Sequence, residues 1–106
     1  MIIEKEYLLD ETNLFYKVKG ASLVLRAISN NIRQLILKLL EQNTRLTVTE
    51  IMVHLRQEQS ITSQHLAILR RSNIVTTKRE GKKIFYALNE SRLQQINRFT
   101  ELLLSA

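Results

Sequence analysis

The chain has no cysteine, no proline and no tryptophan, and only two glycines among its 106 residues. Without cysteine it has no thiol for disulfides, thiolate metal sites, iron–sulfur clusters or redox sensing. Without proline, and with glycine only at Gly20 and Gly81, the usual markers of turns are scarce. Asparagine tolerates left-handed backbone and can replace them. We therefore expect breaks between elements at Asn30-Asn31, Asn43, Asn73 and Asn89.

Long hydrophobic runs are also missing. The longest apolar runs are only a few residues, such as 35–37 and 102–104, whereas a membrane span needs about 20. The first six residues, MIIEKE, carry acidic side chains where a secretory signal would have a basic region and then an apolar stretch. The sequence predicts a cytoplasmic protein with no membrane partner.

What is present is typical of one folded domain spanning residues 1–106. Apolar residues make up 44% and charged residues 25% of the chain, which excludes intrinsic disorder and fibrous repeats. Sixteen Lys and Arg against ten Asp and Glu give a net charge of +6. Such an excess favours polyanionic partners.

Two helices are expected in the first half of the chain, over residues 12–28 and 31–42. Each carries one apolar stripe at helical spacing. The stripes are Leu14, Val18, Ala21, Leu25 and Ile28 in the first, and Ile32, Leu35, Ile36, Leu39 and Leu40 in the second. Ser29 or Asn30 is expected to cap the second helix, and Asn43 to end it in the role usually taken by glycine.

A helix-turn-helix is predicted over residues 47–72. A short helix begins at Thr47 or Thr49, with Glu50 placed to form a capping box with Thr47. A second helix over 59–72 follows after a brief break. Next, residues 74–79 and 83–88 are rich in β-branched and aromatic residues around a glycine-containing joint, which predicts a hairpin over 74–88. A last helix is expected over 90–104, so the expected order is α-α-α-α-β-β-α.

The positive charge is concentrated on the second helix of this motif and on the hairpin. Residues 60–88 contain six of the sixteen basic side chains and only one acidic side chain, Glu80. A solvated basic surface is one interpretation. The alternative is an interface with DNA, because a helix fits the major groove and a basic hairpin reaches the phosphates beside it.

Three motifs in the same order resemble the ArsR/SmtB family of winged-helix transcriptional repressors. Residues 59–69 match the pattern Q-S-x-x-S-x-H-L-x-x-L without gaps, and 27–40 resemble the entry motif A-L-S-D-P-T-R followed by I-L-x-L-L. Residues 74–86 resemble the wing, and the match covers roughly 25–88. The resemblance implies a mainly helical winged helix-turn-helix that is dimeric through its first and last helices and binds double-stranded DNA.

The familiar metal sites of that family are not matched by this chain. Thr47-Val48-Thr49 replaces the Cys-x-Cys of metal-sensing members, and hydroxyls cannot replace thiolates for soft metals. In the last helix Glu90 and Arg92 occupy the positions at which other members have Asp-x-His. Leu103 and Ala106 occupy the positions at which the remaining ligands of that metal site would lie. We expect no metal and no cofactor.

The resemblance implies DNA contacts in the first turns of the second helix of the motif and in the wing. The helix residues are Gln59, Ser60, Ser63 and Gln64, with Thr62 either contacting DNA or packing inward. The wing residues are Arg79, Lys82 and Lys83, which would neutralise phosphates. Arg71, like Arg70, is left between a phosphate contact and stabilisation of the helix dipole.

The two histidines are given no chemistry. His65 is expected to orient the motif through a hydrogen bond. His54 lies four residues after Glu50, on the same helical face, but two ligands are too few for a metal site, so a surface pair is expected.

Apolar stripes on the first and last helices exceed what so small a domain covers alone. In the family these helices form a twofold dimer, which separates two DNA-reading helices by about 34 Å. The candidate interface or core residues are Leu14, Val18, Leu25, Leu93, Ile96, Phe99 and Leu103.

The resulting hypothesis is a homodimeric repressor on an inverted-repeat operator. A protein-interaction adaptor is the alternative. An enzyme is not expected, since no nucleophile, base and orienting group converge; neither is an RNA-binding sheet, because stacking aromatics on an open sheet are missing. The signal sensed stays open between a small organic molecule, a partner protein, pH or none.

Overall fold

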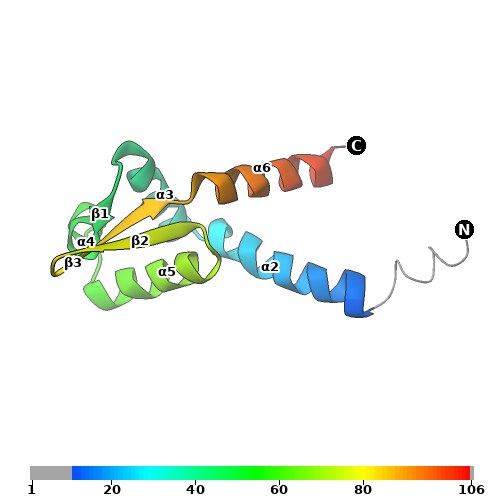
Figure 1. The fold of residues 1–106 in the computed structure, drawn as a ribbon, viewed down its shortest axis with the longest axis horizontal. Helices are drawn as coiled ribbons and strands as arrows, with labels where there is room; N and C mark the ends of the chain where they lie inside the picture. Colours follow the sequence, from blue (N-terminus) through cyan, green and yellow to red (C-terminus); the bar gives the residue numbers. More distant parts are fainter. Residues whose placement is uncertain (1–10, 106) are drawn as a thin grey trace, which may run out of the picture.

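The computed structural model describes residues 11–105, which form helices around a small antiparallel sheet (Figure 1). In chain order the elements are a π-helical turn η1 (Glu11–Phe15), α2 (Tyr16–Ser29), α3 (Asn31–Gln42), β1 (Leu46–Thr47), α4 (Val48–Leu55), α5 (Gln59–Arg71), β2 (Val75–Glu80), β3 (Lys83–Leu88) and α6 (Glu90–Leu104). The expected order of helices and hairpin strands is confirmed. The additions are η1, which precedes α2, and the two-residue strand β1.

Polar side chains cap three of the helices, two of them in the way that the sequence predicts. The Asn30 side-chain oxygen accepts from the backbone N–H of Arg33 at 3.0 Å, at the start of α3. Thr47 and Glu50 form the expected capping box of α4, with each side chain accepting from the backbone N–H of the other at 3.2 and 2.9 Å. Asn89 caps α6 in the same manner. These bonds satisfy amides that a helix leaves unpaired at its first turn.

Asparagine ends only some of the helices in the conformation that we expected. Asn73 has φ of 58°, so its expected left-handed conformation is confirmed. Asn43 ends α3 as expected, but the glycine-like role is wrong, because its backbone is extended, with φ of −127°. Its backbone N–H and side-chain amide both donate to the Leu39 carbonyl, at 3.1 and 3.0 Å, which closes α3 without positive φ. Arg56, a residue the sequence did not indicate, ends α4 in the left-handed conformation.

The sheet has the strand order β1-β3-β2, with both pairings antiparallel. β2 and β3 pair from Val75 with Leu88 to Glu80 with Lys83. Gly81, at φ of 62°, begins the two-residue turn between them, the position that takes glycine in tight hairpins because of its positive φ. β1 pairs with the other edge of β3 through Leu46 and Tyr86, and fastens the hairpin to the helices.

The core lies between α3, α4, α5 and the base of the hairpin. Its buried apolar side chains are Ala27, Ile36, Leu40, Leu46, Ile51, Leu66, Leu69, Ile74 and Val75. Most of them belong to residues 30–89, which we call the body. Each Leu, Ile or Val that is fully buried contributes about 1.5–3 kcal/mol, so the body contains most of the hydrophobic stabilisation.

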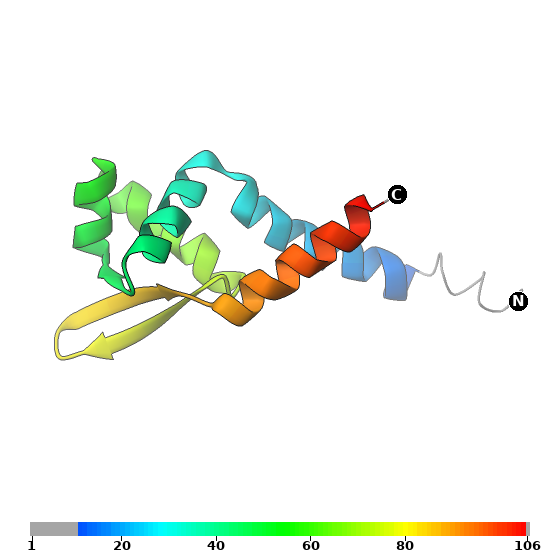
Figure 2. The same cartoon turned by 90° about the horizontal axis from the view of Figure 1, so that it is seen from above.

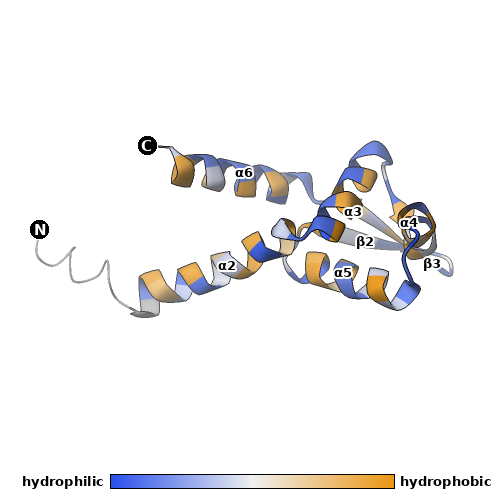
Figure 3. Ribbon diagram, turned by 180° about the vertical axis from the view of Figure 1, so that it is seen from behind, coloured by the Kyte–Doolittle hydropathy of each residue, from blue (hydrophilic) through white to orange (hydrophobic). Residues whose placement is uncertain are grey.

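α2 and α6, which we call the arms, project from the body in the same direction and give the described chain an elongated shape (Figures 1 and 2). α2 buries only Ala27, and α6 buries no residue. Apolar residues recur along both arms (Figure 3). The arrangement of α4, α5 and the β2–β3 hairpin on three further helices confirms the winged helix-turn-helix that the sequence predicts. Within residues 11–105, none of the helices is long and apolar enough to cross a membrane.

Candidate nucleic-acid interface

Four polar side chains are exposed on the first two turns of α5. Gln59, Ser60, Ser63 and Gln64 follow the helical spacing i, i+1, i+4 and i+5, which places them on one face. None of the four side chains has a hydrogen-bond partner within residues 11–105, and Glu58, which precedes the helix, provides no side-chain cap. Their donors and acceptors are therefore free for an external partner. We call these four residues the α5 tip.

Thr62, by contrast, belongs to the core. Its side chain is only 1% exposed, and its hydroxyl donates to the Glu58 carbonyl at 3.0 Å. The possibility that Thr62 contacts DNA through its side chain is thus wrong, and the inward alternative is right. Its position one residue from Ser63 explains the error, because adjacent helical residues point about 100° apart.

The turn of the β2–β3 hairpin carries the second set of sequence-predicted residues. Arg79, Lys82 and Lys83 are exposed, and none of them makes a hydrogen bond or ion pair within the described part of the chain. Their positive charges are therefore available to an anionic partner. We call these three residues the wing cations.

Glu80 is the acidic residue of the hairpin, and Arg45 neutralises it. The Arg45 guanidinium donates to both Glu80 carboxylate oxygens and lies 4.0 Å from the centre of the Phe85 ring. These hydrogen bonds raise the pKa of Arg45 and lower the pKa of Glu80. The pair ties the hairpin to the segment before β1 and neutralises the acidic residue of the hairpin. Among the wing cations, Lys83 also lies close enough to Glu50 to help lower the pKa of that carboxyl group. Sequence reasoning missed Arg45, since 35 positions separate the two residues.

His65 connects α5 to the end of α2 through Arg33. Arg33 Nη1 donates to His65 Nδ1 at 3.1 Å, while its Nε and Nη2 donate to the carbonyls of Ala27 at 2.6 Å and Arg26 at 3.2 Å. A guanidinium only donates, so Nδ1 must be the unprotonated ring nitrogen. Partial burial and then the Arg33 charge lower the pKa of His65. The expected orienting hydrogen bond of His65 is confirmed.

His54 lies on the exposed face of α4, far from any cluster of ligands. Its charge helps to lower the pKa of Glu50, although the hydrogen bonds from Thr47 have the larger effect. Among residues 11–105, no three His, Asp or Glu side chains lie close enough together to hold a metal ion.

Arg71 does not lie with the α5 tip. It is in the last turn of α5, roughly 18 Å along the axis from Gln59 at 1.5 Å per residue. Its place at the carboxyl end favours the helix-dipole interpretation over a contact near the tip. Arg71 instead lines a hollow between α5 and the arms.

The α5 tip and the turn of the hairpin lie at the same end of the molecule, opposite the free ends of the arms. Two perpendicular views agree on this arrangement (Figures 1 and 2). The body thus presents neutral hydrogen-bonding groups on a helix beside three unpaired positive charges on a hairpin. Such a surface suits a polyanion whose edges also offer hydrogen bonds.

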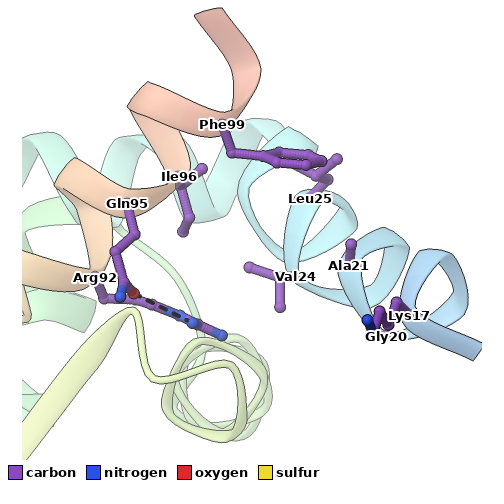
Figure 4. Close-up of a pocket in the computed structure, with 9 residues that line it drawn as sticks. All are labelled: Lys17, Gly20, Ala21, Val24, Leu25, Arg92, Gln95, Ile96 and Phe99. Atoms are coloured by element: carbon purple, nitrogen blue, oxygen red, sulfur yellow. Dashed lines mark hydrogen bonds between the residues drawn. The ribbon is translucent and has the colours of Figure 1, made fainter. Parts of the chain in front are cut away.

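The apolar residues proposed for the arms fall into two groups. Leu14, Val18, Phe99 and Leu103 are exposed, whereas Leu93 and Ile96 pack against the core of the same chain. Leu25 is half-buried and lines a hollow of about 600 Å³ between α2 and α6, with Phe99 from the opposite arm (Figure 4). The structure therefore separates core from exposed residues, a distinction that the stripes alone do not give.

The chain matches known regulators in sequence. Residues 30–77 match the model of the bacterial regulatory protein arsR family. An HTH-type transcriptional regulator of Methanocaldococcus jannaschii is 34% identical over 76% of this chain and 90% of that protein. The transcriptional activator HlyU of Vibrio cholerae is 39% identical over 70% of this chain and 68% of that protein. The transcriptional repressor SdpR of Bacillus subtilis is 35% identical over 67% of this chain and 78% of that protein.

The fold is similar to solved structures as well. Reduced HlyU from Vibrio cholerae superimposes with a TM-score of 0.65 at 33% identity, covering 87% of this chain and 97% of that one. The motifs, the fold and these relatives agree, and the chain belongs to the ArsR family of winged helix-turn-helix transcriptional regulators.

Proposed function

We propose that this chain represses transcription as a homodimer that binds an inverted-repeat operator and blocks polymerase by occupying the promoter. The observation that carries the proposal is the pairing of the α5 tip with the wing cations at one end of the body. In this proposal the α5 tip enters the major groove and the wing cations lie against the flanking phosphates. The relatives include one regulator named an activator and one named a repressor, and both kinds of control need the same DNA-binding step.

Base recognition is assigned to the α5 tip. A Gln side chain makes two hydrogen bonds with adenine, and a short Ser hydroxyl lets the helix approach the bases closely. Each good base contact discriminates against a wrong base by about 1–3 kcal/mol. The four side chains have no competing partner in the described chain, so their hydrogen bonds are not lost on binding.

Affinity without sequence preference is assigned to the wing cations. Positive side chains gain free energy from phosphates mainly by releasing counterions, which makes binding salt-dependent. If a dimer neutralises about 6–10 phosphates, its affinity falls by roughly 10³ to 10⁵ between 50 and 200 mM salt. The Arg45–Glu80 pair supports this role, because it removes the negative charge that would repel a phosphate.

Dimerisation is assigned to the arms. Nine of the thirteen large apolar side chains exposed in the described chain lie in η1, α2 or α6, a concentration that marks an interaction surface. Apolar side chains of a second copy would fill the hollow between α2 and α6. A twofold axis there would place the two α5 tips on successive turns of the duplex.

Two double variants test the DNA-binding assignment. Binding to promoter DNA flanking the gene and to random duplex is measured by fluorescence anisotropy at several salt concentrations. We expect Ser63→Ala/Gln64→Ala to lose about 1–3 kcal/mol per good contact on the specific site only. We expect Lys82→Gln/Lys83→Gln to reduce the salt dependence while keeping the sequence preference. An equal loss on specific and random DNA from the α5 variant would refute its role, and no site-specific binding by the wild type would refute the function.

A further inference from the structure

A second hollow, distinct from the α5 tip and the wing, lies where α2, the start of α3, α5 and α6 meet. Its volume is about 480 Å³, and four arginines line it: Arg26, Arg33, Arg71 and Arg92. Among residues 11–105, no acidic side chain lines it. The remaining lining is partly apolar, from Leu23 and Val24 of α2 and Ile68 of α5. The site therefore combines concentrated positive charge with an apolar wall.

Two of these arginines are held in place by main-chain carbonyls. Arg33 donates to the carbonyls of Ala27 and Arg26, in the last turns of α2. Arg92, from α6, donates to the carbonyl of Ser72 at the end of α5, at 3.1 Å, and to the Gln95 side chain (Figure 4). Both guanidinium groups are thus fixed in position before any ligand arrives, which lowers the entropic cost of binding one.

The side chains of the other two arginines are not held in this way. The side chains of Arg26 and Arg71 make no hydrogen bond or ion pair within residues 11–105, yet both line the same hollow. The carboxyl ends of α2 and α5 offset some of the charge, but each helix end supplies only about half of one negative charge. Two ends therefore balance roughly one of the four positive charges, and most of the charge is left uncompensated.

We propose that this hollow binds a small organic anion with two negative charges and an apolar portion, such as a phosphate monoester. The phosphate would contact Arg26 and Arg71 between the two fixed guanidinium groups, and the apolar portion would lie against Leu23, Val24 and Ile68. Planar guanidinium groups match phosphate oxygens in pairs. The proposal rests on the proposed function for its biological meaning, as an effector site, but the binding itself does not depend on it.

The location gives such a ligand a direct connection to the DNA-binding element. Arg71 is in the last turn of α5, and Ser72, whose carbonyl holds Arg92, follows it. Arg26 and Arg33 belong to the junction between an arm and the body. An anion in the hollow would therefore contact both arms and the helix that carries the α5 tip, so that its occupancy can change how they sit together.

Phenyl phosphate is a suitable probe, because it carries close to two charges at pH 7.5 and one apolar ring. The full-length protein without DNA is titrated with it at constant ionic strength by calorimetry and by amide chemical shifts. Inorganic phosphate serves as the charge-only probe, and benzyl alcohol serves as the ring-only probe. We expect one phenyl phosphate per chain, bound at least tenfold more tightly than inorganic phosphate, with the largest shifts around residues 71–73.

A matched pair of variants distinguishes a built site from general basicity. Arg26→Gln/Arg71→Gln and Lys82→Gln/Lys83→Gln remove the same charge from two places. We expect the first variant to bind phenyl phosphate at least tenfold more weakly than the wild type. The second variant should change the affinity for phenyl phosphate by less than twofold. Equal weakening by both variants, or no binding by a wild type that is folded by circular dichroism, would overturn the proposal. DNA binding by the wild type is measured separately, so its failure would overturn the proposed function and leave the anion result standing.

Discussion

The body and the arms of this molecule differ in how completely each satisfies its own side chains. The body buries Ile36, Ile51, Leu66, Leu69 and Ile74 completely. α6 buries none of its residues, and Leu102, Leu103 and Leu104 are 65–83% exposed. Both regions are regular helix, so secondary structure does not explain the difference. The body is folded against itself, whereas the arms carry an apolar surface that a second chain can cover.

The polar residues show the same division in another form. In the body the α5 tip and the wing cations bring seven polar side chains without internal partners to one end of the molecule. Near the arms, arginines without acidic partners are gathered around one hollow. We propose that the first region binds DNA and that the second binds a partner chain and a small anion.

The largest effect is expected from shortening a buried side chain in the core of the body. Leu66 is fully buried on the inner face of α5, so Leu66→Ala leaves a cavity and should lower the free energy of unfolding by about 2–5 kcal/mol. Urea denaturation measures the loss. Leu104→Ala, at the end of an arm, is the control and should change the free energy of unfolding by less than about 0.5 kcal/mol. Similar losses for the two would remove the distinction between body and arm.

A charge placed on an arm should act on assembly instead. Leu103 and Val53 are both 65% exposed, but only Leu103 lies on an arm. Leu103→Glu should weaken the dimer at least a hundredfold, since two carboxylates would be desolvated in one interface. Val53→Glu should leave the dimer unchanged. Sedimentation velocity over a concentration series measures the monomer–dimer equilibrium of each variant. A wild type that is monomeric at micromolar concentration would contradict the proposed role of the arms.

Gly20, near the start of α2, tests how closely a partner chain packs against this arm. A Cβ built there meets nothing within 4 Å, and Ala is favoured over Gly inside a helix by roughly 0.5–1 kcal/mol. Gly20→Ala should therefore raise the thermal midpoint of the isolated protein slightly. A lowered midpoint together with a weakened dimer would show that the partner chain packs against Gly20 at close range.

The smallest effect concerns the connection between the two regions. The pKa of His65 lies below its ordinary value of 6.5, so the unfolded chain takes up the proton more readily than the folded chain. The stability that the neutral ring provides is complete above pH 6.5 and is lost as the pH falls through the lowered folded pKa. Stability should thus fall between pH 7.5 and 5.5 more steeply in the wild type than in His65→Gln, which keeps an acceptor for Arg33. His54→Gln is the control, and equal slopes for the wild type and His65→Gln would contradict this role.

Much of the fold could be predicted because its signals are local. Apolar residues at helical spacing located α3 and α5, the Thr47–Glu50 pair located the start of α4, and Gly81 located the hairpin turn. Each of these features depends on residues a few positions apart, whose chemistry acts without the rest of the chain. The α5 tip was found in the same way, from a continuous motif.

The features that were missed depend on distant parts of the chain. β1 is too short for a periodic signal and exists because Leu46 and Thr47 pair with β3. Arg45 holds Glu80 across 35 positions. Thr62 looks like its polar neighbours in the sequence, and only the packing of α5 on the body turned its side chain inward.

The order of residues alone determined which segments become helix or hairpin, where most of them begin, and where positive charge accumulates, because hydrogen bonding and side-chain periodicity act between near neighbours. Tertiary packing decided which apolar residues are core and which are left on the arms. It also brought Arg26, Arg33, Arg71 and Arg92 from four helices to one hollow, since charges far apart in the chain meet only when helices pack.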